Sequence, residues 1–169
     1  LDGYEDLIVV SKNKYIYAFD YNGLKWSNET NSQLIATPTI GNFNNDNQLE
    51  VIVSGYTNDT NNLYVFSYTG EQIDFFQTLE KNKSGFAIAD INGNEVNDIV
   101  FGTDANNLYL IYDGNQIASG FPFSASDKFR LAPTILKNSD EFTIIAPCKN
   151  KTLYAINESG LEKFSIEFD

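Results

Sequence analysis

The residues best suited to chemistry lie in an acidic, turn-rich segment that occurs more than once. Residues 90–98 read DINGNEVND, and residues 42–50 read NFNNDNQLE. Each segment places oxygen-bearing side chains at its first, third, fifth and ninth positions, around a turn at the sixth. Such a loop can surround a hard cation that takes six to eight oxygen ligands at about 2.3 to 2.6 Å. The alternative is structural, because Asp and Asn side chains also hydrogen-bond to nearby backbone and so form turns between strands.

Repeated strands along the chain must position these segments. Four strands begin at a tyrosine and lead to a turn glycine; the pairs are Tyr17 and Gly23, Tyr64 and Gly70, Tyr109 and Gly114, and Tyr154 and Gly160. The tyrosines advance by 47, 45 and 45 residues. A second family of strands, rich in Ile and Val, precedes them at 7–10, 51–54, 99–102 and 143–146. A third family occurs at 36–40, 85–89 and 131–135, and a more polar fourth segment follows the turn glycines, for example at 73–79 and 117–123.

Four short strands in each unit of about 45 residues, without helical periodicity, are typical of a β-propeller blade. A β-sandwich is the alternative, although a sandwich needs no fixed period. We therefore predict an all-β chain that forms a partial β-propeller over residues 1–169, with four consecutive four-stranded blades at 1–33, 34–80, 84–126 and 129–169. The first unit opens at its second strand, so its inner strand is missing. We expect the chain to be a fragment of a larger propeller, with the remaining blades among its partners.

The acidic segments resemble the calcium loops of the FG-GAP/VCBS repeat family, in which an Asp-x-Asp/Asn-x-Asp-Gly-x-x-Asp pattern precedes an Ile/Val-rich strand. That resemblance implies an integrin-α-like propeller and three loops that bind Ca²⁺. The ligands it implies are Asp90, Asn92, Asn94 and Asp98 with the Val96 carbonyl; Asn42, Asn44, Asp46 and Glu50 with the Gln48 carbonyl; and Asp2 and Asp6 with the Tyr4 carbonyl. Loops at 42–50 and 90–98 each hold two carboxylates at these positions, which predicts weak sites of about 0.1 to 1 mM. The family places glycine at position six, where this chain has Gly3, Asn47 and Glu95.

A second likeness covers residues 17–26, which read YAFDYNGLKW. This segment resembles the repeat of quinoprotein-like propellers, in which an Ala-x-Asp pattern followed by Gly and Trp packs neighbouring blades together. Tryptophan occurs once in the chain. We therefore interpret the segment as blade-packing chemistry common to both families, and we predict no quinone cofactor.

Charge and composition exclude several functions. The formal net charge of −12 repels phosphate backbones and anionic lipid headgroups, so nucleic acid is not an expected partner. No apolar stretch approaches the about 20 residues of a membrane span, which argues against direct membrane insertion. The chain has no histidine, nucleophile elbow or phosphate loop, and its acidic residues recur at turns rather than converging once. We predict that this chain is not an enzyme.

The sequence as a whole favours a non-catalytic extracellular propeller scaffold for protein or glycan binding or adhesion, with loops stabilised by calcium. The expected location is extracellular, on the cell surface or in the periplasm. Two alternatives stay open: an accessory propeller domain of a secreted enzyme, and a docking component of a cell-envelope or secretion assembly. Exposed loops on a rigid frame are where the binding residues of such proteins usually lie.

Overall fold

A computed structural model describes residues 5–44, 46, 48–57, 63–73, 76–139 and 141–169. These residues form sixteen strands and no helix, so the prediction of an all-β chain is confirmed. No helix that could span a membrane occurs in the described part of the chain. Every paired strand is antiparallel to its neighbour, as expected for strands joined by short turns.

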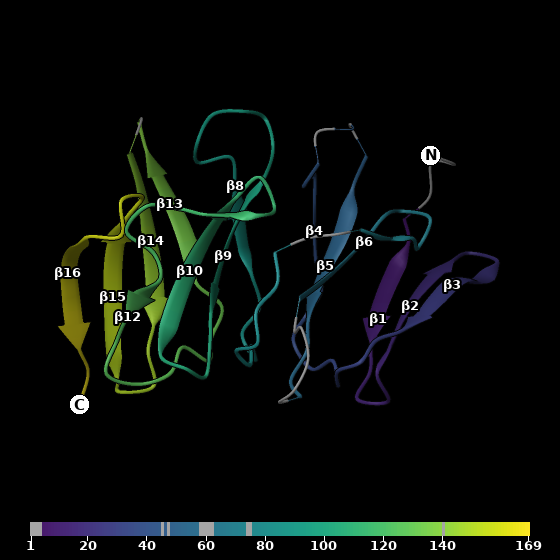
Figure 1. The fold of residues 1–169 in the computed structure, drawn as a ribbon, viewed down its shortest axis with the longest axis horizontal. Helices are drawn as coiled ribbons and strands as arrows, with labels where there is room; N and C mark the ends of the chain where they lie inside the picture. The colour runs from purple at the N-terminus through teal and green to yellow at the C-terminus, as the bar shows by residue number, and fades with distance from the viewer. Residues whose placement is uncertain (1–4, 45, 47, 58–62, 74–75, 140) are drawn as a thin grey trace.

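The strands form four sheets that follow one another in chain order across the molecule (Figure 1). The first sheet contains β1 (Leu7–Val10), β2 (Tyr15–Asp20) and β3 (Gly23–Glu29), and the second contains β4 (Thr39–Gly41), β5 (Glu50–Ser54), β6 (Leu63–Phe66) and β7 (Gln72–Ile73). The third sheet contains β8 (Ala87–Ala89), β9 (Asp98–Gly102), β10 (Asn107–Tyr112), β11 (Gln116–Ile117) and β12 (Phe123–Ser124). The fourth contains β13 (Thr134–Asn138), β14 (Glu141–Pro147), β15 (Thr152–Asn157) and β16 (Glu162–Glu167).

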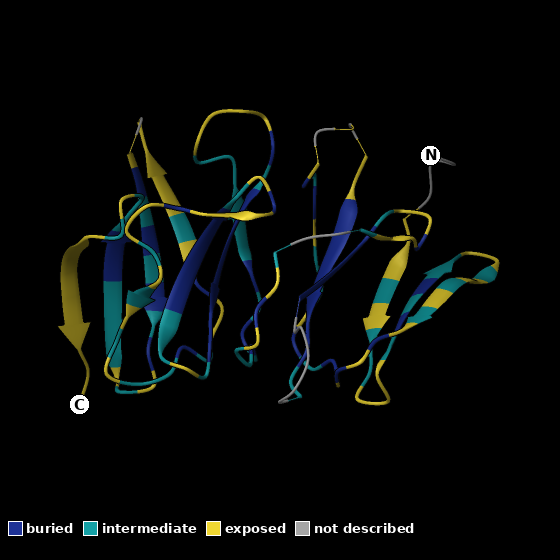
Figure 2. Cartoon of the chain, viewed as in Figure 1, coloured by how far each residue is buried: buried dark blue, intermediate teal, exposed yellow. Residues whose placement is uncertain are grey.

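Within each sheet the strands lie in sequence order, and the most buried are the central ones, which are β2 in the three-stranded first sheet and the two middle strands in each other sheet (Figure 2). In the third sheet the outer strand is interrupted, and its two parts, β11 and β12, both pair with β10. The sequence predicted one continuous outer strand at 117–123. Gly120, with a φ of +86°, and Pro122, which has no N–H to donate, break the strand between these two parts.

Three apolar clusters hold the four sheets together, one between each pair of neighbours. Because side chains alternate along a strand, each central strand of the second and third sheets contributes to two clusters. In β5, Val51 and Val53 pack toward the first sheet while Ile52 packs toward the third. In β9, Phe101 belongs to the cluster with the second sheet and Val100 to the cluster with the fourth. The second and third sheets are therefore buried on both faces.

The outer faces of the first and fourth sheets are apolar and accessible. On the first sheet the rings of Tyr15, Tyr17 and Phe19 stack in a row along β2, with centroids 5.8 and 6.2 Å apart, and Leu7 of the paired β1 is 62% exposed. On the fourth sheet, Phe164 of β16 is 50% exposed. An apolar surface of this kind is usually covered by another layer of structure.

The connections lie along two opposite rims of the sheets (Figure 1). We define the upper rim by the β4–β5, β8–β9 and β13–β14 connections and the turns that enter the outer strands. The lower rim carries the β1–β2, β9–β10 and β14–β15 turns and the segments that enter β8 and β13. Both predicted loops at 42–50 and 90–98 therefore belong to the upper rim.

Candidate functional site

The β8–β9 loop is closed around the carboxylate of Asp90. Its Oδ1 accepts hydrogen bonds from the backbone N–H groups of Gly93 (2.7 Å) and Asn94 (3.0 Å), and its Oδ2 from that of Glu95 (2.9 Å). Burial alone would raise the pKa of Asp90, but these backbone donors lower it below its ordinary value. Glu95 adopts a left-handed φ of +70°, so position six keeps the turn that the family fills with glycine.

Asp98 closes the other end of the same loop. Its side chain is fully buried, and its Oδ2 accepts hydrogen bonds from the backbone N–H groups of Ile91 (2.8 Å) and Asn92 (3.1 Å). Burial raises the pKa of Asp98, against the effect of these two donors and of the backbone N–H of Asp113. Its Oδ1 has no hydrogen-bond partner among the described residues. A buried carboxylate oxygen without a donor is costly unless something else compensates its charge.

Asp113 joins this loop from the β10–β11 turn, and sequence reasoning missed it. The side-chain amides of Asn92 (3.3 Å) and Asn94 both donate to Asp113 Oδ1. The signal available in the sequence was the position of Asp113 directly before Gly114, one of the recurring turn glycines. Because that turn lies on the same rim as the β8–β9 loop, it brings a third carboxylate to the loop.

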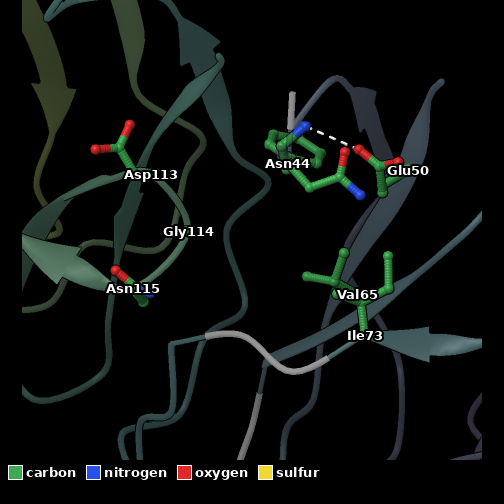
Figure 3. A pocket seen from close by; sticks show the side chains of 8 residues that line it. Asn44, Glu50, Val65, Ile73, Asp113, Gly114 and Asn115 are labelled. Atoms are coloured by element: carbon green, nitrogen blue, oxygen red, sulfur yellow. Dashed lines mark hydrogen bonds between the residues drawn. The ribbon is translucent and has the colours of Figure 1, made fainter. Parts of the chain in front are cut away.

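The β4–β5 loop follows the same plan with different residues. Successive side-chain oxygens accept from the backbone two residues on: Asn42 Oδ1 from Asn44 (3.4 Å), Asn44 Oδ1 from Asp46 (3.1 Å) and Asp46 Oδ1 from Gln48 (2.9 Å). Glu50, at position nine, is buried and its Oε2 accepts from the backbone N–H of Phe43 at 2.8 Å (Figure 3). These contacts are the side-chain-to-backbone turns of the structural alternative.

The two loops are joined directly across neighbouring sheets. The backbone N–H of Asn97 donates to the carbonyl of Asn42 at 2.8 Å, and the backbone N–H of Asn42 donates to Asn97 Oδ1 at 3.0 Å. A hollow of about 140 Å³ lies between the second sheet and the β10–β11 turn. Asn44, Glu50, Val65 and Ile73 line it on one side, and Asp113, Gly114 and Asn115 line it on the other (Figure 3). Phe43 is also among its lining residues.

The remaining predicted ligands are arranged differently. Asp2 and Tyr4 lie outside the described residues. Asp6 forms an ion pair with Lys25 at 2.7 Å, and its role as a ligand stays a prediction because the rest of its loop lies outside the described residues. Val96, at position seven, has a buried side chain, and Gln48 is exposed. Within the described ranges, no group of three or more acidic, histidine or cysteine side chains lies close enough together to hold a metal ion.

Comparison with known proteins identifies the fold. No protein-family model matches the chain, and no curated protein sequence matches it. Solved structures do match: the BBS1N structure in complex with ARL6DN, soaked with lead, has a TM-score of 0.76 at 10% identity, over 99% of this chain and 54% of that one. The fold is propeller-like.

Two further solved structures match over similar shares of both chains. BamB from Moraxella catarrhalis has a TM-score of 0.67 at 8% identity over 96% of this chain and 45% of that one. Sqt1 from Saccharomyces cerevisiae has a TM-score of 0.66 at 14% identity over 96% and 44%. The chain thus spans about half the length of the structures that it resembles. The likeness to FG-GAP/VCBS repeats stays a prediction.

The buried carboxylate of Glu50 makes stability depend on pH. Burial raises its pKa, the Phe43 backbone donor lowers it, and the charge of Asp46 raises it. A raised folded-state pKa means that stability is highest below the ordinary glutamate pKa and is lost as pH rises through the raised value. We expect Glu50→Gln to raise the Tm in calcium-free buffer at pH 8 by about 2 to 4 °C, the shift that about 1 kcal/mol produces in a chain of this size.

The difference should vanish below about pH 4, where Glu50 of the parent chain is also neutral. Thermal melts at both pH values test this, with the exposed Glu71→Gln as control. If Glu50→Gln changed the Tm relative to the parent chain equally at pH 8 and pH 4, the charge of Glu50 would not be penalised by burial.

Proposed function

We propose that this chain is part of a β-propeller that acts as a non-catalytic scaffold for protein binding, with calcium held by its upper-rim loops. The propeller-like frame supports the scaffold role, since three continuous apolar clusters fix the sheets and leave polar loops exposed on both rims. One of the similar structures is itself a complex with a protein partner, BBS1N with ARL6DN.

The observation that carries the calcium proposal is the buried, unpartnered Oδ1 of Asp98 in a loop of oxygen donors. A cation would compensate this charge, and carboxylate and amide oxygens are the donors that calcium prefers. Asp90, Asp98, Asn92 and Asn94 would hold the ion, with Asp113 adjacent. The ion would supply charge compensation and stiffness to the loop, not catalysis. Sites of such weak expected affinity suit the calcium-rich extracellular or periplasmic setting that we propose for the protein.

We further propose that additional sheets complete a propeller around this chain. The accessible outer faces of the first and fourth sheets support this, as does the length of the similar structures, about twice that of this chain. Strand β1 would pair with an inner strand on its unpaired side. Leu7 and the row of stacked rings on β2 would then become buried in a fourth apolar cluster.

Calcium titration of the chain by calorimetry, with Tm measured in parallel, tests the loop proposal. We expect calcium to raise the Tm of the parent chain and to give a binding isotherm in the range of about 0.1 to 1 mM. The double variant Asp90→Asn and Asp98→Asn should lose both responses. Its matched control, Asp20→Asn and Asp104→Asn, removes two carboxylates from other turns and should keep them. Equal responses of the two double variants would overturn the calcium site.

The scaffold proposal has a separate test. Affinity capture with the folded chain should retain a partner in a stoichiometric, saturable complex. Phe101→Ala, which removes a fully buried core ring, should lose that partner because the rim loops are no longer held in place. A chain that captures no saturable partner, or whose core variant captures the same proteins, would contradict the scaffold role.

A further inference from the structure

Positive charge is concentrated on the lower rim of this acidic protein. Eight of the eleven lysines and arginines lie there: two in the β1–β2 turn, two in the β14–β15 turn, and Lys81, Lys83, Lys128 and Arg130 in the segments that enter β8 and β13. The chain as a whole has a formal net charge of −12. Backbone hydrogen bonds hold these two entering segments on the rim. The N–H of Asp104 donates to the carbonyl of Lys81 (2.8 Å), and the N–H of Lys149 donates to the carbonyl of Lys128 (2.9 Å).

A hollow of about 430 Å³ lies among these residues. We call it the basic hollow and define it by Tyr56, Leu79, Lys81, Asp104, Lys128 and Arg130, which are among its lining residues. Lys83 lies beside it, with its Nζ 3.8 Å from the centroid of the Tyr56 ring, and Lys81 Nζ is 5.1 Å from the same centroid. Two ammonium groups over one ring are held close together by this cation–π contact.

The two carboxylates that line the basic hollow, those of Glu80 and Asp104, already accept hydrogen bonds within the chain. Asp104 accepts from Arg130, with Nε to Oδ1 at 2.8 Å and Nη2 to Oδ2 at 3.3 Å. Glu80 accepts from the side chains of Thr103 (2.6 Å), Asn107 (2.9 Å) and Tyr109 (2.9 Å). None of the ion pairs among the described residues includes Lys81, Lys83 or Lys128. A hydrogen bond from Lys83 lowers the pKa of Tyr56, in accord with the positive surroundings of its ring.

We propose that the basic hollow binds an acidic peptide segment of a partner protein. Carboxylates of the segment would meet Lys81, Lys83 and Lys128, and an apolar side chain would lie against Leu79, which is 74% exposed. This inference rests on the proposed function only in taking the chain as a protein-binding scaffold. It assigns the docking to the lower rim, on the side opposite the proposed calcium loops.

The charge distribution favours a short acidic segment over a long polyanion. At physiological ionic strength electrostatic interactions are screened beyond about 8 Å, so a short segment at the basic hollow experiences mainly the local lysines. A long nucleic acid would extend over the acidic remainder of the surface and be repelled by it. An inorganic anion would use the charges but leave Leu79 uncovered.

Fluorescence anisotropy with the intact chain tests the proposal. The probe is a labelled ten-residue peptide of Glu, Asp and Leu, and its control replaces each Glu and Asp by Gln and Asn. The variant Lys81→Glu, Lys83→Glu and Lys128→Glu should bind the acidic peptide about tenfold or more weakly than the parent chain, the loss expected for three reversed charge pairs. The matched control, Lys12→Glu, Lys14→Glu and Lys151→Glu, changes the net charge equally on the same rim and should lose less than about threefold.

Thermal melts establish that both triple variants fold, and the neutral variant Lys81→Gln, Lys83→Gln and Lys128→Gln provides a milder second test. Equal losses in the two triple variants, equal binding of the neutral peptide, or no binding to the parent chain at 1 mM acidic peptide (about −4 kcal/mol) would overturn the proposal. Tighter binding of a single-stranded DNA of ten nucleotides, lost in the hollow variant, would assign the hollow to nucleic acid instead. Saturable partner capture that survives the hollow variant would leave the scaffold role intact and place its docking surface elsewhere.

Discussion

Replacing Gly120 by alanine should destabilise the chain by about 3 kcal/mol or more, whereas Gly93→Ala should cost only about 1 kcal/mol. Both glycines have positive φ, +86° and +79°, so both substitutions force alanine into the left-handed region. They differ in their surroundings. A Cβ at Gly120 would overlap the carbonyl oxygen of Ser159, while a Cβ at Gly93 would meet no atom within 4 Å. The difference between the variants therefore isolates the cost of the backbone contact.

The contact at Gly120 joins two sheets backbone to backbone. Gly120 lies in the interrupted outer strand of the third sheet, and Ser159 and Gly160 form the β15–β16 turn of the fourth. Because a backbone cannot move aside as a long side chain can, Gly120→Ala must separate the two turns. Urea unfolding of both variants measures the two losses through their midpoints at constant m. Similar losses for Gly120→Ala and Gly93→Ala would mean that the turns separate at no cost.

Phe101→Ala should lower the free energy of unfolding by about 3 to 5 kcal/mol, which is enough to unfold many domains. Phe101 is fully buried between the second and third sheets. Its ring stacks on Tyr109 at a centroid distance of 5.2 Å and meets the edge of Phe86 at 5.8 Å. The substitution therefore removes two aromatic contacts and leaves a cavity in the cluster that joins these sheets.

Phe164→Ala is the matched control, because its ring lies on the accessible outer face of β16. It should cost less than about 1 kcal/mol in this chain. Phe101→Leu should fall between the two, since it keeps most of the apolar volume. Urea unfolding followed by fluorescence and circular dichroism measures all three variants. Equal losses for Phe101→Ala and Phe164→Ala would show that the inter-sheet cluster does not hold the fold.

Much of the fold could be predicted from the sequence because the central strands carry a strong local signal. The inner strands were located less closely: the one expected at 131–135 is β13, at Thr134–Asn138. The strand expected at 7–10 is β1, and that expected at 51–54 differs from β5 by one residue. Outer strands were predicted less well: the segment expected at 73–79 is represented in the structure by β7, at Gln72–Ile73. Outer strands bury little surface, so no strict alternation of apolar residues marks their limits.

The candidate site shows where such local reasoning ends. The loop residues at 90–98 could be selected from their spacing, but Asp113 reaches the loop from a different connection, and its only signal in the sequence is its position before the turn glycine Gly114. Asp6 also pairs with Lys25, a contact that the spacing of the loop residues does not encode, because β3 places the lysine beside it. Glu95 stands at position six, where the family has glycine, and it adopts the left-handed φ there because its N–H donates to the Asp90 carboxylate.

The reciprocal hydrogen bonds between Asn42 and Asn97 have a consequence for motion. Each loop end donates one backbone N–H to the other, so neither loop can open without exposing an amide of its neighbour. Local opening on this rim is therefore shared between the second and third sheets, and the two amides should exchange with solvent deuterium at matched rates. Local unfolding that begins in either loop therefore extends to the adjacent sheet, and the β4–β5 and β8–β9 loops open as one cooperative unit.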